Sequence, residues 1–356
     1  MMIEIDGSHG EGGGQILRTS IALSALTMRP VRVSTIRTGR PSPGLKRQHM
    51  AGIDIISQLV DAKVKGLEVG STKVEFAPRG RRGGHYSYDV GTAGSISLIL
   101  QAALPTAALA PEPIRLSLTG GTDVSWSPPI DFMSAVFAHT VRKMGLHVEI
   151  SVKKRGHFPR GGGRVSCAIT PVEELAPLEL VDSGDIVGVG GISHCVRLPS
   201  HVARRQADSA HSVLREYGIE QIAIDTESYQ KNEDRHLGPG SGIVIWAESE
   251  QGTRLGADRL GERGKPAEDV GSECAHQLID EISTGMAVDS HLCDMLVPYM
   301  MLASGTSTIG VTRITAHLKT NLWVAQKMLD ANASLEGEIG GPGKLAVKGV
   351  GFSLRD

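Results

Sequence analysis

The chain has 356 residues, of which 40% are hydrophobic and 21% charged, and its formal net charge is −2. This composition excludes a disordered chain, and at ~150 residues per domain the length predicts two or three folding units. The apolar stretches 98–110 and 295–303 each contain Pro and are too short to span a bilayer, so we expect no membrane segment. We expect no secretory signal at the N-terminus, and four scattered cysteines without a CxxC motif favour a cytoplasmic protein.

Three segments of the chain share one pattern, in which a Gly- or Ser-rich opening leads into a helix, a strand, a second helix and a hairpin. The first helices are expected at 12–26, 91–109 and 290–303, and the strands at 31–36, 114–119 and 307–314. The second helices are expected at 45–60, 132–144 and 322–329, and the hairpins at 64–77, 147–170 and 334–347. This alternation predicts an α+β fold of three repeated units, with helices on one face of the sheets.

The spacing of the three units predicts an inserted domain. The first two units begin roughly 80 residues apart, whereas the third begins about 200 residues later. We therefore expect a body of three repeats, at about 1–85, 86–181 and 283–356, and a smaller α/β domain at 182–282. The insert holds 18 acidic and 10 basic residues, and the remainder 21 acidic and 27 basic residues, so an acidic insert would accompany a basic body.

Each repeat also contains one window without acidic residues. The windows 12–53, 150–172 and 295–329 carry seven, five and three bases. Three such windows favour a phosphate-rich ligand over three unrelated solvated faces, because a cleft lined by one sign of charge concentrates polyanions.

A run of glycines opens the first helix. Gly12, Gly13 and Gly14 would expose backbone N–H groups at the positive end of the helix, which is a cradle for phosphate. Glu11 at its mouth would repel phosphate unless a divalent cation lay between them, and Arg18 could face the same cleft. The alternative is a tight strand–helix turn that needs glycine only for packing.

Two further loops carry bases beside glycines. Arg37 and Arg40 form a basic loop suited to bidentate phosphate contacts, or else a solvated surface loop. The segment 157–164 contains three glycines inside a hairpin, which would allow either close approach of a ligand or a flexible crossing.

His317 follows a strand-like run and precedes a helix that Thr320 or Asn321 could cap. A neutral imidazole is a good nucleophile toward phosphorus, and Asp294 is a candidate partner or nucleotide contact. The alternative is a structural histidine. Other histidines, including His49 and His194, show neither HxxxH nor HExxH spacing, so we expect no zinc site.

Taken together, these motifs resemble the RNA 3′-terminal phosphate cyclase family over essentially the full length. The resemblance is carried by DGSHGEGGGQILR at 6–18, IRTGRPSPGLKRQH at 36–49, GGTD followed by PP at 120–129, FPRGGG at 158–163 and HLKTN at 317–321. It implies three β-α-β-α-β-β units like the C-terminal domain of a bacterial translation initiation factor, in the enolpyruvyl-transferase-like superfamily, with a small inserted domain.

The resemblance further implies a ligase that converts an RNA 3′-terminal phosphate to a 2′,3′-cyclic phosphodiester. The reaction would use ATP with Mg²⁺ or Mn²⁺, pass through adenylyl-histidine and RNA-(3′)pp(5′)A, and release pyrophosphate and AMP. The implied partner is RNA with a 3′-phosphate end, and homo-oligomerisation is left open.

By the same resemblance, His317 matches the nucleophile and Glu11 a carboxylate at the metal and the triphosphate. The other implied residues are, for the phosphate pocket, Arg18, Arg37, Arg40 and Gln48, and, for nucleotide contacts, Gln101, Pro128, His291 and Asp294. Two positions depart from the family pattern: Met295 stands where Gln is frequent, and His291 where some members have Tyr.

Two alternatives remain. Ribosome-assembly relatives of the same fold bind RNA without the nucleophile, but the intact HLKTN segment argues against that reading. An enolpyruvyl-transferase-like enzyme would share basic pockets, yet it accounts neither for His317 nor for the acidic insert.

Overall fold

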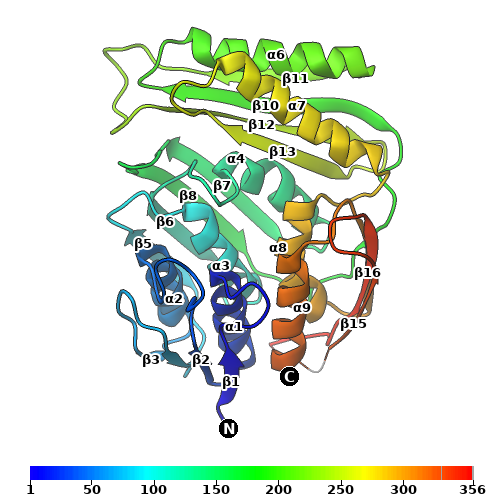
Figure 1. Cartoon of the computed structure of the whole chain (residues 1–356). Coiled ribbons are helices and arrows are strands. Elements are labelled where there is room, and N and C mark those ends of the chain that lie inside the picture. The colour runs from blue at the N-terminus through cyan, green and yellow to red at the C-terminus, as the bar shows by residue number, and fades with distance from the viewer. Residues whose placement is uncertain (330, 355–356) are drawn as a thin grey trace.

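Figure 1 shows the computed structural model of the chain, which describes residues 1–329 and 331–354. The described strands form four four-stranded sheets. Three of the sheets share one arrangement, in which the first strand pairs parallel with the second, the second pairs antiparallel with the fourth, and the third lies at the edge. The mixture of helices and small sheets fits the predicted α+β class.

The three sheets and their helices follow one another along the chain, with the third completed by the C-terminal segment. The first unit contains β1 (Ile3–Asp6), α1 (Gly14–Thr27), β2 (Val31–Ser34), α2 (Arg47–Leu59), β3 (Lys63–Lys65) and β4 (Val74–Ala77). The second contains β5 (Gly84–Asp89), α3 (Ile96–Ala108), β6 (Ile114–Gly120), a helix at 130–142 and the hairpin β7 (His147–Lys154) and β8 (Gly163–Thr170). The third contains β9 (Glu179–Leu180), α8 (Ser290–Leu302), β14 (Thr306–Val311), α9 (Ala316–Met328), β15 (Asn332–Gly337) and β16 (Gly343–Lys348).

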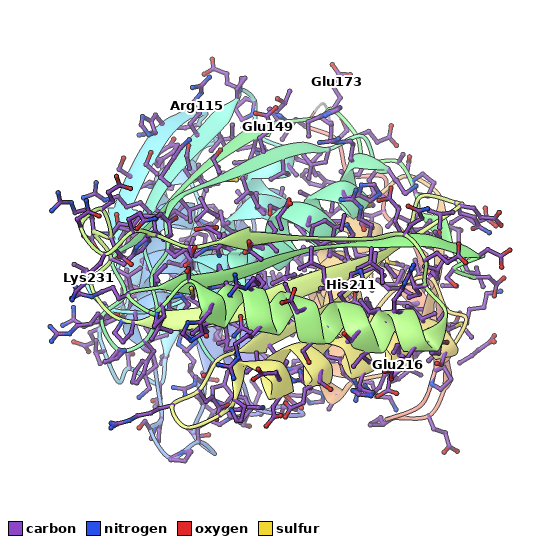
Figure 2. All side chains as sticks on the ribbon, turned by 90° about the horizontal axis from the view of Figure 1, so that it is seen from above. Arg115, Glu149, Glu173, His211, Glu216 and Lys231 are labelled. Carbon is purple, nitrogen blue, oxygen red and sulfur yellow. The ribbon has the colours of Figure 1, made fainter. Side chains whose placement is uncertain are left out.

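The fourth sheet lies between β9 and α8 in the chain and occupies the top of the molecule in Figure 1. Its strands, in spatial order, are β11 (Ile222–Glu227), β10 (Ile186–Val196), β12 (Gly240–Ser249) and β13 (Arg254–Leu260). Helices α6 (His201–Tyr217) and α7 (Ala267–Ser283) pack together on this sheet. We call this part the insert sheet. Seen from above, α6 lies in front and presents His211 and Glu216 to the outside (Figure 2).

Local sequence explains where several elements begin, end and turn a face inward. Ser95 caps α3, since its side chain accepts a hydrogen bond from the Leu98 amide at 3.2 Å. Met28 ends α1 in a left-handed conformation with φ of 55°. In β8, Val165, Cys167 and Ile169 are buried, as the two-residue period of a strand predicts.

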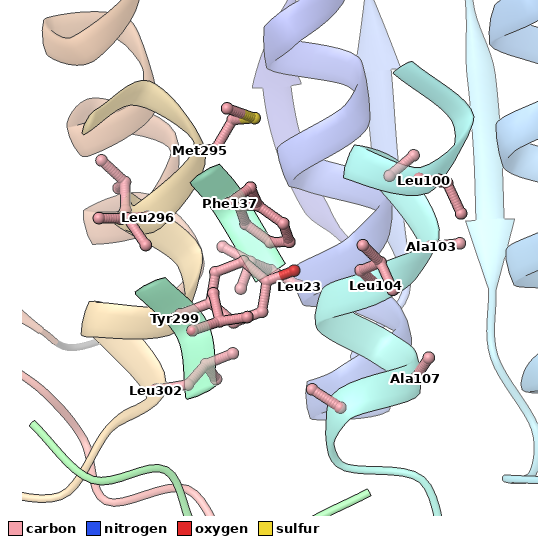
Figure 3. Packing of buried hydrophobic residues seen from close by; sticks show 14 of the residues in the cluster. Leu23, Leu100, Ala103, Leu104, Ala107, Phe137, Met295, Leu296, Tyr299 and Leu302 are labelled. Carbon is pink, nitrogen blue, oxygen red and sulfur yellow. The ribbon is translucent and has the colours of Figure 1, made fainter. Parts of the chain in front are cut away.

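Two hydrophobic cores lie beneath these sheets. The larger one joins α1, α3 and α8, and Figure 3 shows Phe137 and Tyr299 facing each other within it, with ring centroids 5.6 Å apart. The smaller one lies between the insert sheet and its two helices and includes Leu214, Ile245 and Leu278. No helix among the described residues is long and apolar enough to cross a membrane.

The structure corrects the predicted elements in several places. Helix α9 begins at Ala316 rather than 322, and β11 and β13 of the insert were missed. The helix predicted at 132–144 begins at Ile130 and contains a π-helical turn, η1 (Met133–Phe137), between α4 (Ile130–Phe132) and α5 (Ala138–Arg142). In a π-helical turn the hydrogen bonds join residues five apart, one more than in an α-helix. Hydrophobic periodicity in the sequence does not reveal this local change.

Candidate active site

The side chains of His317 and Glu11 meet where α9 begins. The structure places His317 Nδ1 2.8 Å from Glu11 Oε2, although 306 positions separate the two residues in the sequence. The His317 side chain is 48% exposed and the Glu11 side chain 32%, so a ligand can reach both. With its proton on Nδ1, the imidazole donates to the carboxylate and leaves the Nε2 lone pair free. This geometry suits a nucleophile whose tautomer is fixed by an acidic partner.

The helix that carries His317 is capped by Thr315, not by Thr320 or Asn321 as predicted. Thr315 Oγ1 accepts from the Leu318 amide at 2.8 Å and donates to Asp294 Oδ1, also at 2.8 Å. Asn321 lies inside the helix, where its Nδ2 donates to the Asp294 carbonyl at 2.8 Å. Asp294 therefore positions the start of α9, and Glu11 is the carboxylate on the imidazole.

A second set of hydrogen bonds connects α9 to α1. Thr19 Oγ1 donates to Asn321 Oδ1 at 2.8 Å, and Gln15 Nε2 donates to the same oxygen at 3.0 Å. Gln15 in turn accepts from Arg18 Nη2. Sequence reasoning missed Gln15, Thr19 and Thr315. The signal available was their position: Gln15 is inside the motif at 6–18, Thr19 directly follows it, and Thr315 stands two residues before the motif at 317–321. The network holds the two helix N-termini side by side.

Electrostatics keep the imidazole neutral. Burial lowers the pKa of His317, and Arg18, Arg40 and His291 lower it further, while Glu11 acts in the opposite direction. Neutral imidazole, the nucleophilic form, is therefore the main species at neutral pH. The influence of His291 on this pKa also places it near His317.

Arginines lie around the glycine run. Arg40 Nη2 donates to the Glu11 carbonyl at 3.3 Å. Burial lowers the pKa of Arg18 to about 10, which still leaves it cationic at neutral pH. A Cβ built on Gly14 would lie 2.5 Å from His49 Nε2 and 3.3 Å from Arg18 Nη1, so only glycine lets these groups approach the backbone. The result is a cationic cradle at the start of α1.

Among the other predicted site residues, Gln101, Asp294 and Gln48 lie near the starts of α1 and α3. Gln101 and Asp294 line one cavity together with Arg18 and Met295. Gln48 Oε1 accepts from the Ser95 amide at 3.4 Å, beside the start of α3.

Arg37, Pro128 and His291 are among the predicted residues that do not line that cavity. Arg37 Nη1 donates to the carbonyls of Ser42 and Gly44 in its own loop. Pro128 is half-buried just before α4, and His291 is exposed in the first turn of α8, edge-on to Phe132 at 6.3 Å.

The predicted Mg²⁺ or Mn²⁺ fits the donor set at Glu11. One carboxylate oxygen faces His317, and the other has no hydrogen bond within the described part of the chain. A hard cation accepts such an oxygen together with phosphate oxygens, so Glu11 and a bound triphosphate would share it.

Asp294 should make the stability of the protein depend on pH. Burial raises its pKa to about 7, above the ordinary 3.8, so the folded protein holds this proton more tightly than the unfolded chain does. The stabilisation is full below about pH 4 and is lost as the pH rises to about 7. We expect Asp294→Asn to be more stable than the parent at pH 8, by on the order of 2 kcal/mol, and to show little gain at pH 4. Urea unfolding at both pH values measures this, and an equal difference at both would contradict it.

Gly44 should be essential to the basic loop, and Gly39 in the same loop offers a matched control. Gly44 has φ of 73°, and a Cβ there would lie 2.1 Å from the Gly70 carbonyl oxygen. Gly39 has open space around it. We expect Gly44→Ala to lower stability by about 1–3 kcal/mol and to weaken binding of a phosphate-bearing ligand, because Arg37 is held by the Gly44 carbonyl. Gly39→Ala should change neither; equal effects of the two variants would show that the loop does not depend on this turn.

A neutral histidine that a carboxylate orients can attack phosphorus. The arginines around it can bind the phosphates that leave. A sequence model of the family described as RNA 3′-terminal phosphate cyclase matches residues 9–335 of the chain. The chain belongs to this family. The resemblance seen in the motifs is confirmed, and so is the predicted enzyme class, a ligase.

Curated relatives agree with this assignment. A protein named RNA 3′-terminal phosphate cyclase from Methanopyrus kandleri is 50% identical over 351 residues, covering 98% of this chain and 99% of its own. One of the same name from Hyperthermus butylicus is 51% identical over 356 residues, with 98% of each chain covered. A third, from Thermococcus kodakarensis, is 50% identical over 345 residues, covering 97% of this chain and 98% of its own.

Proposed function

We propose that the chain converts an RNA 3′-terminal phosphate to a 2′,3′-cyclic phosphodiester at the expense of ATP, with His317 as the nucleophile. The observation that carries this proposal is the 2.8 Å contact between His317 Nδ1 and Glu11 Oε2. It leaves Nε2 as the attacking atom, beside the cationic cradle at the start of α1.

The reaction takes three steps. In the first, His317 Nε2 attacks the α-phosphorus of ATP, the bond to the β-phosphate oxygen breaks, and pyrophosphate leaves. In the second, an oxygen of the RNA 3′-phosphate attacks the adenylyl phosphorus, the P–N bond breaks, and RNA-(3′)pp(5′)A forms. In the third, the adjacent 2′-OH attacks the 3′-phosphorus, loses its proton, and AMP leaves. The last step is intramolecular, so proximity supplies much of its acceleration.

The residues of the site would divide this work. Glu11 holds the Nδ1 proton and stabilises the imidazole as it becomes positively charged. Arg18 and Arg40, with Arg37 and Gln48 farther out, would bind the phosphates, and Gln101, Pro128, His291 and Asp294 the nucleotide. A bound Mg²⁺ or Mn²⁺ would neutralise charge on the departing pyrophosphate.

We also propose that the chain consists of three repeats and an inserted domain, and that the protein is cytoplasmic. The shared strand order of three sheets supports three repeats at about 1–85, 86–181 and 283–356. The separate hydrophobic core of the insert sheet supports a domain at 182–282. All four cysteines are buried and unpaired, which supports a reducing, cytoplasmic setting.

The test uses a pair of RNA oligonucleotides that end in a 3′-phosphate and differ only in the 2′ position of the last sugar. With ATP and Mg²⁺, the ribose end should become a phosphatase-resistant cyclic phosphate. The 2′-deoxy end should stop at RNA-(3′)pp(5′)A, because the third step lacks its nucleophile. No change in either RNA would overturn the proposal and favour the non-catalytic, RNA-binding alternative.

A further inference from the structure

A buried cluster of three potential metal ligands lies between the second sheet and the insert sheet. Asp123 follows β6, His157 follows β7, and His194 belongs to β10. One potential ligand atom from each residue lies within 4.8 Å of the other two, and all three residues are buried. Asp123 and His157 are also joined by a parallel backbone bridge. Ligands from both parts of the molecule therefore converge on one point.

Most polar atoms of this cluster have no hydrogen-bond partner among the described residues. These are Asp123 Oδ1, His157 Nε2 and both ring nitrogens of His194. His194 Nε2 is 3.8 Å from Asp123 Oδ2, which is too long for a hydrogen bond. Each buried polar group without a partner costs ~1–3 kcal/mol. Four such atoms converging at one place indicate a site built for a ligand.

The charge around the cluster favours a cation. The buried Arg155 contacts Asp123 at 3.4 Å, Asp131 at 2.7 Å and Glu227 at 2.6 Å, so one positive charge faces three carboxylates. Arg155 and the Thr122 hydroxyl both bond Asp123 Oδ2 and leave Oδ1 free. A divalent cation at Oδ1 would offset the negative excess.

The histidines supply lone pairs instead of charge. Both ring nitrogens of His194 and Nε2 of His157 have no hydrogen-bond partner in the described part of the chain, and the two ring centroids are 5.2 Å apart, so both imidazoles can offer a lone pair to one ion. Two neutral imidazoles and one carboxylate form a donor set that suits Zn²⁺ or Co²⁺ better than Mg²⁺.

A fourth histidine lies beside the three. His236 Nδ1 is 2.8 Å from Asp234 Oδ1, and its buried Nε2 has no partner in the described part of the chain. A histidine that donates one nitrogen to a carboxylate and leaves the other free is typical of metal ligands. His236 also packs against Tyr229, with ring centroids 4.6 Å apart, and the Tyr229 hydroxyl donates to Glu227, the carboxylate that Arg155 binds.

We propose that Asp123 Oδ1, His157 Nε2 and one ring nitrogen of His194 bind a single Zn²⁺-type ion, with His236 as the nearest further donor. The site uses none of the residues around His317 and is a second metal site beside the one expected at Glu11. Its ligands come from β10 and from the ends of β6 and β7, so the ion would fasten the insert sheet to the second sheet. The sequence has no HxxxH spacing and for that reason predicts no zinc site. Such spacing cannot reveal this cluster, because its ligands come from three separate segments of the chain.

The test is a Co²⁺ titration of metal-stripped His317→Ala protein, in which the exposed imidazole of the other site is gone. We expect one equivalent of Co²⁺ to give visible d–d bands with nitrogen and oxygen ligands, and Zn²⁺ to displace it. Asp123→Asn and His194→Gln, made in the same background and close in size to the native side chains, should weaken binding by about 100-fold or more. The control, His211→Ala, removes an exposed histidine of α6 and should bind like the parent.

A variant that is less stable could lose Co²⁺ binding simply because it unfolds. Thermal melts with and without Zn²⁺ separate this case from the loss of a ligand. Zn²⁺ should raise the Tm of the parent and of His211→Ala, but not that of Asp123→Asn, because only a folded site gains binding energy. Absence of visible bands in the parent, or equal titration curves for Asp123→Asn and His211→Ala, would overturn the proposal. Either outcome leaves the proposed cyclase reaction untouched, because no readout depends on activity.

Discussion

His317→Ala should reduce cyclisation of a 3′-phosphate RNA by at least ~10³-fold in kcat, because removal of a covalent nucleophile eliminates the pathway rather than slowing it. The affinity for ATP should change little, since Arg18 and Arg40 still line the cradle. Single-turnover assays and ATP binding by calorimetry measure the two quantities separately.

The matched control is His276→Ala, which removes an exposed histidine from α7, far along the chain from the site. It should retain parental activity. Both variants should unfold at the parental temperature, since His317 is half-exposed and its ring makes one polar contact within the described part of the chain, to Glu11. Substantial cyclisation by His317→Ala would contradict a covalent role for this residue.

Glu11→Gln should lower kcat by about 10²–10⁴-fold, because an amide no longer fixes the tautomer or stabilises the imidazolium that forms on attack. It should also move the acidic limb of the pH–rate profile. Glu11 raises the pKa of His317, so its neutralisation lowers that pKa and shifts the limb to lower pH.

The pH shift separates two roles of Glu11. If the carboxylate acted only through a divalent cation, saturating Mg²⁺ would restore the rate and the acidic limb would stay in place. We expect incomplete rescue together with the shifted limb.

Much of the fold was predictable because it depends on local patterns. The helix predicted at 12–26 is α1, and the strand predicted at 114–119 is β6, since small and apolar residues repeat with clear periods there. The start of α9 was not predictable to the same degree. The His317 segment is short and polar. The choice of Thr315 as the cap depends on its hydrogen bond to Asp294, which belongs to another helix, α8.

The sequence named candidate residues for the site but did not indicate how they are arranged. The sequence indicated Glu11 beside phosphate and Asp294 beside His317, whereas the structure has Glu11 on the imidazole. Which carboxylate reaches a ring nitrogen is decided by how α1 and α9 pack together, and spacing along the chain contains no information about that packing. The cluster of Asp123, His157 and His194 was missed for the same reason.

The most direct test of the central claim is incubation of the protein with α-labelled ATP and Mg²⁺ without RNA, followed by a denaturing gel. We predict a labelled protein band that is acid-labile and base-stable, as a phosphorus–nitrogen bond requires, and that is absent from His317→Ala. Addition of 3′-phosphate RNA should then remove the label from the protein. An unlabelled protein that is folded and binds ATP would contradict the covalent mechanism.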